Sequence, residues 1–144
     1  MLAAAKTHDS AATGRRFIAA IAHRAWDELA TCLDDAVQFR GLTAKGLFSA
    51  DDRMSAANHV QKWFGWLDQL ALVSSEIQPM HDRLHMSYRF RAHKNQWYLI
   101  EQQAYCSVQD GQIKQIDLVC SGFCPEVAPP LEQRGRNRKQ PDLR

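Results

Sequence analysis

His59 is the side chain of this sequence best suited to proton transfer near neutral pH, because the pKa of an unperturbed imidazole is about 6.5. It lies one turn before Trp63 in a stretch with the apolar spacing of a helix. At that position it can exchange a proton with a molecule held beside the indole. The same position also suits a histidine at a pocket rim or in solvent. His59 is therefore one of two candidate catalytic residues.

Asp117 is the other candidate, because it lies in the middle of a strand that follows the strong hairpin signal Asp110-Gly111. A two-residue turn there pairs Asp117 with Ala104 and places the carboxylate on the apolar face of the sheet. A bulge would instead turn Asp117 to solvent and leave the residues on either side of it facing inward. The sequence leaves both orientations open.

The other histidines and the cysteines lack the spacing of a metal site or of an activated nucleophile. His81 and His85 on an extended chain are about 13 Å apart, too far for one metal ion. Cys120 and Cys124 have no further ligands nearby in the sequence. We expect the four cysteines to be reduced and to pack as small apolar groups. No metal is predicted, and the absence of a phosphate-binding glycine motif predicts no cofactor.

Helical spacing is confined to the first half of the chain. Apolar residues recur at three- and four-residue steps from Arg15 to Leu33, with a break near Trp26-Asp27, and again after Asp51-Asp52. A short strand, Val37–Thr43, is predicted between the two helical stretches, with Phe39 at its centre and a loop after it. The helices therefore precede the long strands.

From Leu70 onward the apolar pattern alternates, which indicates strands with one packed face and one solvated face. The predicted strands are 71–80, 84–93, 96–108 and 112–123. Elements segregated in this order are typical of an α+β domain, with N-terminal helices packed on a curved antiparallel sheet. The sequence shows no internal repeats.

The register of the central hairpin follows from charge and hydrophobicity. A three-residue turn over Lys94–Gln96 places Arg89 opposite Glu101 and Phe90 opposite Ile100, matching ion with ion and apolar with apolar. A two-residue turn would break both matches.

The same register puts Trp97, Leu99 and Tyr105 on the outer face of the sheet. This face is too apolar to be fully solvated, so we expect it to be buried against a second copy of the chain in a homodimer.

The overall composition suits one domain without a special partner. The chain has 144 residues and a formal net charge of +2, which gives no reason to expect nucleic acid or a membrane. No signal-peptide core or membrane span is visible, so we expect a cytoplasmic protein. We divide the chain into an N-terminal segment (residues 1–14), the domain (15–124) and a basic, proline-containing disordered tail (125–144). The basic run is Arg134, Arg136, Arg138 and Lys139.

This order of elements resembles the nuclear transport factor 2 superfamily, which has a cystatin-like, cone-shaped α+β fold and includes ketosteroid isomerases and SnoaL-type polyketide cyclases. The ending Cys120–Pro125 is also similar to that of a subgroup of uncharacterised members. The other stretches that carry the resemblance are Arg15–Ile18, Trp26–Leu29, Leu33–Phe39, Trp63–Leu67 and Gln109–Ile113.

The resemblance implies a pocket between the concave sheet face and the helices, and dimers formed through the outer sheet face. A small apolar or aromatic molecule is the expected ligand. Either of two polar residues, Tyr88 or Gln102, would orient a carbonyl group of this ligand. The apolar residues named as ligand-binding are Trp26, Trp63, Trp66, Met86, Phe90 and Cys106, although aromatic residues at helical spacing are also typical of a core.

The catalytic residues of the ketosteroid isomerases have no equivalents here. Their carboxylate base falls at Phe39 or Arg40, and their helix tyrosine falls at Phe17. Their protonated acid falls near Gln103 or Ala104. None of these side chains can perform the corresponding step, so that activity is not expected.

Cyclases of the superfamily use an acid on a late strand, which makes Asp117 the candidate base. The sequence therefore predicts a pocket protein of the SnoaL-like class, with acid–base isomerisation, cyclisation or hydration as its chemistry. The alternative is a non-catalytic binding or protein-interaction module with a vestigial pocket.

Overall fold

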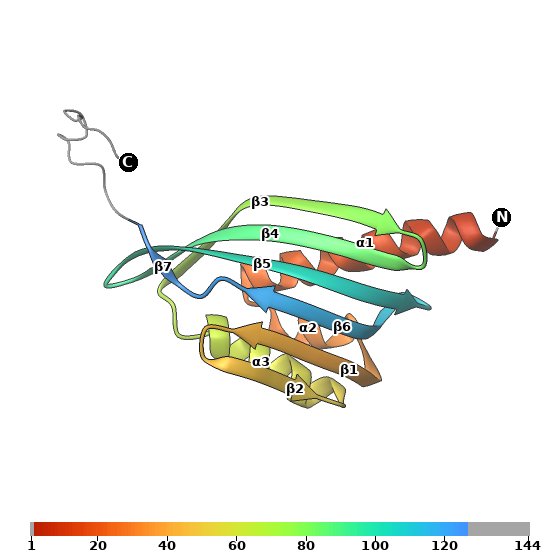
Figure 1. Ribbon diagram of the computed structural model, residues 1–144, viewed down its shortest axis with the longest axis horizontal. Coiled ribbons are helices and arrows are strands. Elements are labelled where there is room, and N and C mark those ends of the chain that lie inside the picture. Colours follow the sequence, from red (N-terminus) through yellow and green to blue (C-terminus); the bar gives the residue numbers. More distant parts are fainter. Residues whose placement is uncertain (1, 127–144) are drawn as a thin grey trace.

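The computed structural model describes residues 2–126, and their side chains from residue 10 onward. Three helices, α1 (Leu2–His23), α2 (Trp26–Thr31) and α3 (Arg53–Phe64), lie on one side of a long, curved sheet (Figure 1). The first helix thus extends through residues 2–14, which the sequence pattern separates from the domain. The basic run of the predicted tail lies outside the described residues.

The sheet has the strand order β2-β1-β6-β5-β4-β3, and β7 pairs with β5 beyond the end of β6. The pairing of β1 with β6 is parallel and the other pairings are antiparallel. The prediction of an antiparallel sheet is therefore wrong at one pair, and the sheet is mixed. The strands are β1 (Leu33–Thr43), β2 (Gly46–Ala50), β3 (Gln69–Met80), β4 (Arg83–Lys94), β5 (Gln96–Gln109), β6 (Gln112–Cys120) and β7 (Cys124–Pro125).

The ends of the helices have local causes. Arg24 adopts a positive φ of 54°, which ends α1 at His23, three residues before the predicted break at Trp26-Asp27, and allows α2 to turn back. Asp52 caps α3, because its carboxylate accepts a hydrogen bond of 2.8 Å from the backbone N–H of Ser55. The hydrogen bonds from Ser55 lower the pKa of Asp52, and the predicted start of this helix is confirmed.

The predicted register of the central hairpin is confirmed. Arg89 lies opposite Glu101 and Phe90 lies opposite Ile100, with Asn95 at a positive φ of 68° in the turn. Positive φ angles at Asp110 and Gly111 form the second tight turn at its predicted position.

The loop predicted after β1 is instead a hairpin. β1 continues to Thr43 and turns through residues 44–45 into β2, where Leu42 lies opposite Leu47. Only five residues long, β2 is too short for its alternation to stand out from a loop.

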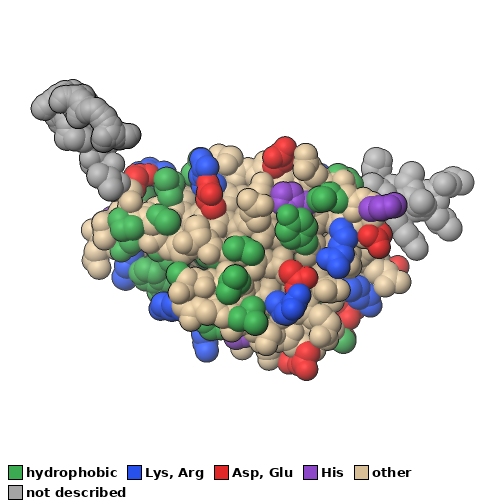
Figure 2. Space-filling view, in the orientation of Figure 1, with side chains coloured by type: hydrophobic (Ala, Val, Ile, Leu, Met, Phe, Trp, Pro, Cys, Tyr) green, Lys and Arg blue, Asp and Glu red, His purple; other side chains and the backbone are tan. Residues whose placement is uncertain are grey.

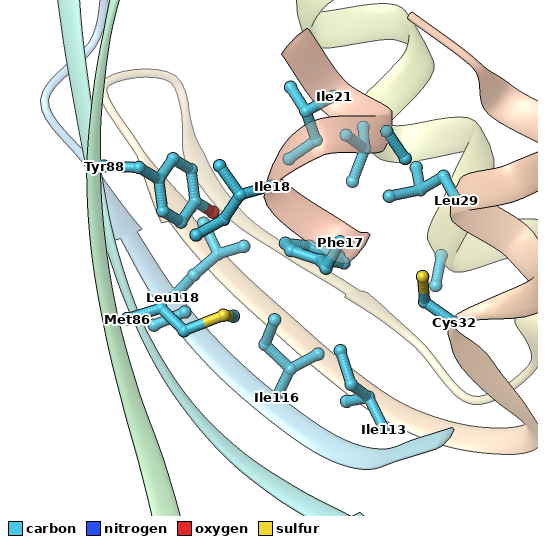
Figure 3. Packing of buried hydrophobic residues seen from close by; sticks show 14 of the residues in the cluster. Phe17, Ile18, Ile21, Leu29, Cys32, Met86, Tyr88, Ile113, Ile116 and Leu118 are labelled. Atoms are coloured by element: carbon cyan, nitrogen blue, oxygen red, sulfur yellow. The ribbon is translucent and has the colours of Figure 1, made fainter. Parts of the chain in front are cut away.

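The core lies between the helices and the inner face of the sheet. Met86, Phe90 and Ile100 all point to the helical side and are at most 1% exposed, as their alternation predicts. Figure 3 shows Phe17 and Ile18 of α1 between the other helices and the sheet. The inner part of the cone is therefore filled by side chains.

Trp97, Leu99 and Tyr105 occupy the predicted outer face. Tyr105 is 42% exposed, whereas Trp97 is partly covered within the chain by the guanidinium of Arg91, which lies 4.1 Å from its ring centre. Figure 2 shows apolar side chains in separate groups among charged ones on the surface in view. Dimerisation through this face stays a prediction. None of the helices in residues 2–126 has an apolar stretch that would span a bilayer.

Candidate functional site

A hollow of about 550 Å³ opens where α3 ends, between the β1–β2 hairpin and the segment that follows β6. We call it the aromatic hollow. Its volume suits a small organic molecule. The lining residues are Thr43, Ala44, Lys45, Phe48, His59, Lys62, Trp63, Trp66, Ile100, Cys120, Gly122 and Phe123.

Aromatic rings make up most of one wall. Phe48 of β2 meets His59 and Trp63 of α3 edge-on, with ring centres 5.3 and 5.8 Å apart. Phe39 of β1 supports the same two rings from the core, at 5.9 Å from each. On the other side, Trp66 meets Phe123 at 5.3 Å. Such rings present wide apolar surfaces to a flat ligand.

Gly41 allows Trp63 to lie against the sheet. A Cβ atom at position 41 would come within 2.8 Å of Cη2 of Trp63, well inside the 3.5–4.0 Å of ordinary carbon contacts, about the optimum for attraction. The glycine of β1 therefore sets how deeply the indole sits and how much of the hollow stays open.

An ion pair fixes the segment after β6, which closes the hollow. Glu126 accepts two hydrogen bonds from Arg91, at 2.7 and 3.0 Å, and this guanidinium lowers the pKa of Glu126. The backbone N–H of Glu126 also donates to the carbonyl of Trp97 at 2.9 Å. Phe123 then packs against Phe64 and Tyr98. The wall is held by both charge and packing.

His59 lies in this wall, as one of the sequence alternatives predicts. Its Nε2 is 3.1 Å from the carbonyl oxygen of Ser49, and its ring stacks on Phe39. A neutral ring that donates from Nε2 to a carbonyl keeps its lone pair on Nδ1. The backbone of β2 thus favours one tautomer, in which Nδ1 is the basic nitrogen.

Tyr88 and Gln102 lie behind the wall and form a buried pair. Their exposed fractions are 2% and 1%, and the Tyr88 hydroxyl donates to Oε1 of Gln102 at 2.7 Å. Burial raises the pKa of Tyr88 well above its ordinary value. Among the described residues, Nε2 of Gln102 has no hydrogen-bond partner. Gln102 lies opposite Cys120 and two residues along β5 from Ile100, both of which line the aromatic hollow.

Asp117 lies on the outer face of the sheet. The predicted pairing with Ala104 is wrong, because a register shift after Ser107 places Asp117 opposite Tyr105. Its carboxylate binds Nε of Arg40 at 2.8 Å and borders a separate outer hollow that includes Gln115. The bulge that the sequence left open as an alternative is the arrangement found.

The other predicted binding residues belong to the core. Met86, Phe90 and Cys106 are fully buried, and Trp26 packs against the core from the start of α2. Burial raises the pKa of Cys106 to about 12, so this thiol stays protonated and is no nucleophile at neutral pH. Within residues 10–126 no cluster of His, Cys, Asp and Glu could hold a metal ion.

The structure thus brings together Trp63, Trp66 and His59 from the predicted set. Sequence reasoning missed Phe48, because it lies on the unrecognised strand β2. It also missed Phe123 and Lys45, which lie outside helices and strands and have no periodicity to read, and Lys62, a charged residue of α3 beside Trp63.

No family model matches the sequence, and no curated protein matches it. Solved structures do match. One is a candidate polyketide cyclase from Xanthomonas campestris pv. campestris, with 17% identity over 78% of this chain and 90% of the other, at a TM-score of 0.65. A protein of ketosteroid isomerase-like fold from Catenulispora acidiphila, solved with trimethylamine, has 10% identity, covers 76% and 85%, and has a TM-score of 0.65. An LEH-like epoxide hydrolase from M. tuberculosis has 11% identity, 79% and 84% coverage, and a TM-score of 0.60. At these identities the likeness concerns the fold.

Proposed function

We propose that this chain, which has the ketosteroid isomerase-like fold of the nuclear transport factor 2 superfamily, binds a small, largely apolar molecule in the aromatic hollow. The observation that carries the proposal is an open volume of about 550 Å³ walled by Phe48, Trp63, Trp66 and Phe123. Soluble domains normally bury rings of this kind, so a wall of them around open space suits a ligand with its own apolar surface.

The buried pair behind the wall supports a ligand with a hydrogen-bond acceptor. An amide N–H without a partner in the core costs free energy, roughly 1–3 kcal/mol for an ordinary buried polar group. The Nε2 of Gln102 is such a group. In the sheet Gln102 lies opposite Cys120 and two residues from Ile100, and both of these residues line the hollow. A carbonyl at the inner end of the ligand would satisfy it after a small movement of that wall.

Binding without catalysis agrees with the distribution of acids. Among residues 10–126 no Asp or Glu side chain is buried, and none lines the aromatic hollow. Acid–base chemistry on carbon needs a base within hydrogen-bond reach of the reacting proton. We therefore favour the binding module over a carboxylate-based isomerase or cyclase.

Replacing Trp63 with alanine should weaken binding of N-phenyl-1-naphthylamine, a neutral fluorescent probe, by about five- to thirtyfold. The change removes aromatic contact worth roughly 1–2 kcal/mol. A fluorescence titration measures the affinity. Trp97→Ala is the matched control, because that indole lies on the outer face under Arg91 and its loss should leave probe affinity unchanged. Equal affinity of Trp63→Ala and the wild type, with both folded by circular dichroism, would contradict the proposal.

One observation favours acid–base chemistry as a second candidate function. His59 borders the hollow, and its bond to Ser49 leaves Nδ1 as the basic nitrogen. A ketone held beside it would exchange its α-protons faster than in water. We expect 2-tetralone in D₂O to exchange about tenfold or more faster with the wild type than with His59→Gln, as followed by proton NMR. Identical rates would rule out a proton-transfer role for His59.

A further inference from the structure

Two cations stand at the mouth of the aromatic hollow without acidic partners. Lys45 projects from the β1–β2 turn and Lys62 from the last turn of α3, and both are exposed lining residues. Neither forms an ion pair with any residue in the described part of the chain. By contrast, Lys94 and Lys114 pair with Asp68 and Asp34, at 3.4 and 3.0 Å.

The acidic side chains of neighbouring segments pair with other cations or border a different hollow. Asp68, which follows α3, faces Lys94. Glu101 of β5 pairs with Arg89 on the outer face, and Glu126 is held by Arg91. Asp51, the acid closest in sequence to Phe48, borders the separate outer hollow. The mouth therefore has positive charge that no described side chain balances.

The end of α3 opposes this charge only in part. The C-terminal carbonyls of a helix have a partial negative charge, which would disfavour an anion close to them. Two of these carbonyls accept hydrogen bonds: that of Gln61 from the Gly65 N–H at 2.6 Å, and that of Trp63 from Nε1 of Trp66 at 2.9 Å. Lys62 also lies within the last turn, where its charge is partly offset. Lys45, on a turn, has no such offset.

We infer that the ligand is an organic anion with a flat apolar body that fills the aromatic hollow and a carboxylate that lies at the mouth between Lys45 and Lys62. This inference rests on the proposed function and names the class of ligand. The rings supply apolar contact, and the two ammonium groups supply selectivity for charge. Single lysines act as point charges without the paired geometry of arginine, which suits a carboxylate held at a solvated rim.

Binding of 2-naphthoate and of its neutral counterpart 2-naphthamide tests the inference. The wild type should bind the anion about five- to tenfold more tightly at low ionic strength, measured by isothermal titration calorimetry. About 0.5 M sodium chloride should remove most of this difference by screening and should leave the amide unaffected. Lys45→Gln should lose about three- to fivefold in affinity for the anion and Lys62→Gln somewhat less, with no change for the amide.

Lys114→Gln is the matched control, because that ammonium pairs with Asp34 and does not line the hollow. It should bind both probes as the wild type does. Equal affinity of the wild type for the two probes, or an unchanged preference in the double Lys45→Gln, Lys62→Gln variant, would overturn the anion inference and leave the proposed function standing. If neither probe binds, the proposed function fails together with it.

Discussion

Phe39→Ala is expected to lower the free energy of unfolding by about 3–5 kcal/mol, because the ring is 1% exposed and its removal leaves a cavity. The ring lies in the middle of β1, between Ala50 of β2 and Ile116 of β6 in the register of the sheet. It also supports His59 and Trp63 from below. Urea denaturation followed by circular dichroism measures the loss.

Phe48→Ala is the matched control, since Phe48 meets the same two rings but is only partly buried and faces the hollow. It should reduce probe affinity as Trp63→Ala does and cost clearly less stability than Phe39→Ala, about 1–2 kcal/mol. If the two alanine variants were equally stable, the assignment of Phe39 to the core and Phe48 to the wall would be wrong.

The surroundings of Phe39 also bear on chemistry, because the resemblance to ketosteroid isomerases implies that their base falls at Phe39 or Arg40. In this chain Phe39 supports the floor of the hollow, and Arg40 points outward to bind Asp117. The inner face of β1 is therefore built for packing. Asp117, the partner of Arg40, lies on the outer face of the sheet, away from the aromatic hollow.

The fold was predictable where neighbouring elements restrict one another. The β4–β5 register follows from matching Arg89 with Glu101 and Phe90 with Ile100, and a slip by one residue would expose every apolar side chain. The start of α3 follows from the cap at Asp52. The likeness to solved ketosteroid isomerase-like structures confirms the predicted fold.

The sequence left the orientation of Asp117 open, because a bulge of one residue does not disturb the regular alternation on either side of it. The shift between Ser107 and Val108 occurs where Ile113 and Ile116 are both buried, a spacing of three that a regular strand does not allow. That spacing was the available signal. Read as a bulge, it would have turned Asp117 outward.

The wall of the aromatic hollow that faces α3 could not be predicted from the sequence. Helical spacing marked Trp63 and Trp66, but the opposite wall comes from a turn and from the irregular segment that ends in Phe123. Such segments have no period to read. Their positions depend on long-range contacts, such as the ion pair of Arg91 with Glu126.

The second large expected effect is on the stability of the Tyr88–Gln102 pair. The stability losses of the two single variants should not add in the double variant. Tyr88→Phe should cost about 1–3 kcal/mol, because it leaves Oε1 of Gln102 buried without a donor. Gln102→Leu should cost somewhat less, since it strands the Tyr88 hydroxyl but also removes the unpartnered Nε2. The double variant should be close to the wild type in stability, because it replaces a buried polar pair by apolar groups of similar shape. The coupling energy would then equal the sum of the two single losses, about 3–4 kcal/mol at the middle of these ranges.

Denaturant titrations of the wild type, the two single variants and the double variant measure the four free energies of unfolding. If the losses of the two single variants simply add in the double variant, the two residues do not form a coupled pair. Ligand binding separates structure from function. Naphthalene should bind the double variant as well as the wild type. By the proposed function the carbonyl of 2-acetonaphthone pairs with the Gln102 amide, so this ketone should bind the double variant about tenfold more weakly. If the double variant keeps its stability but loses affinity for the ketone, the buried amide of Gln102 serves ligand binding. Undiminished ketone binding would leave Gln102 a packing residue.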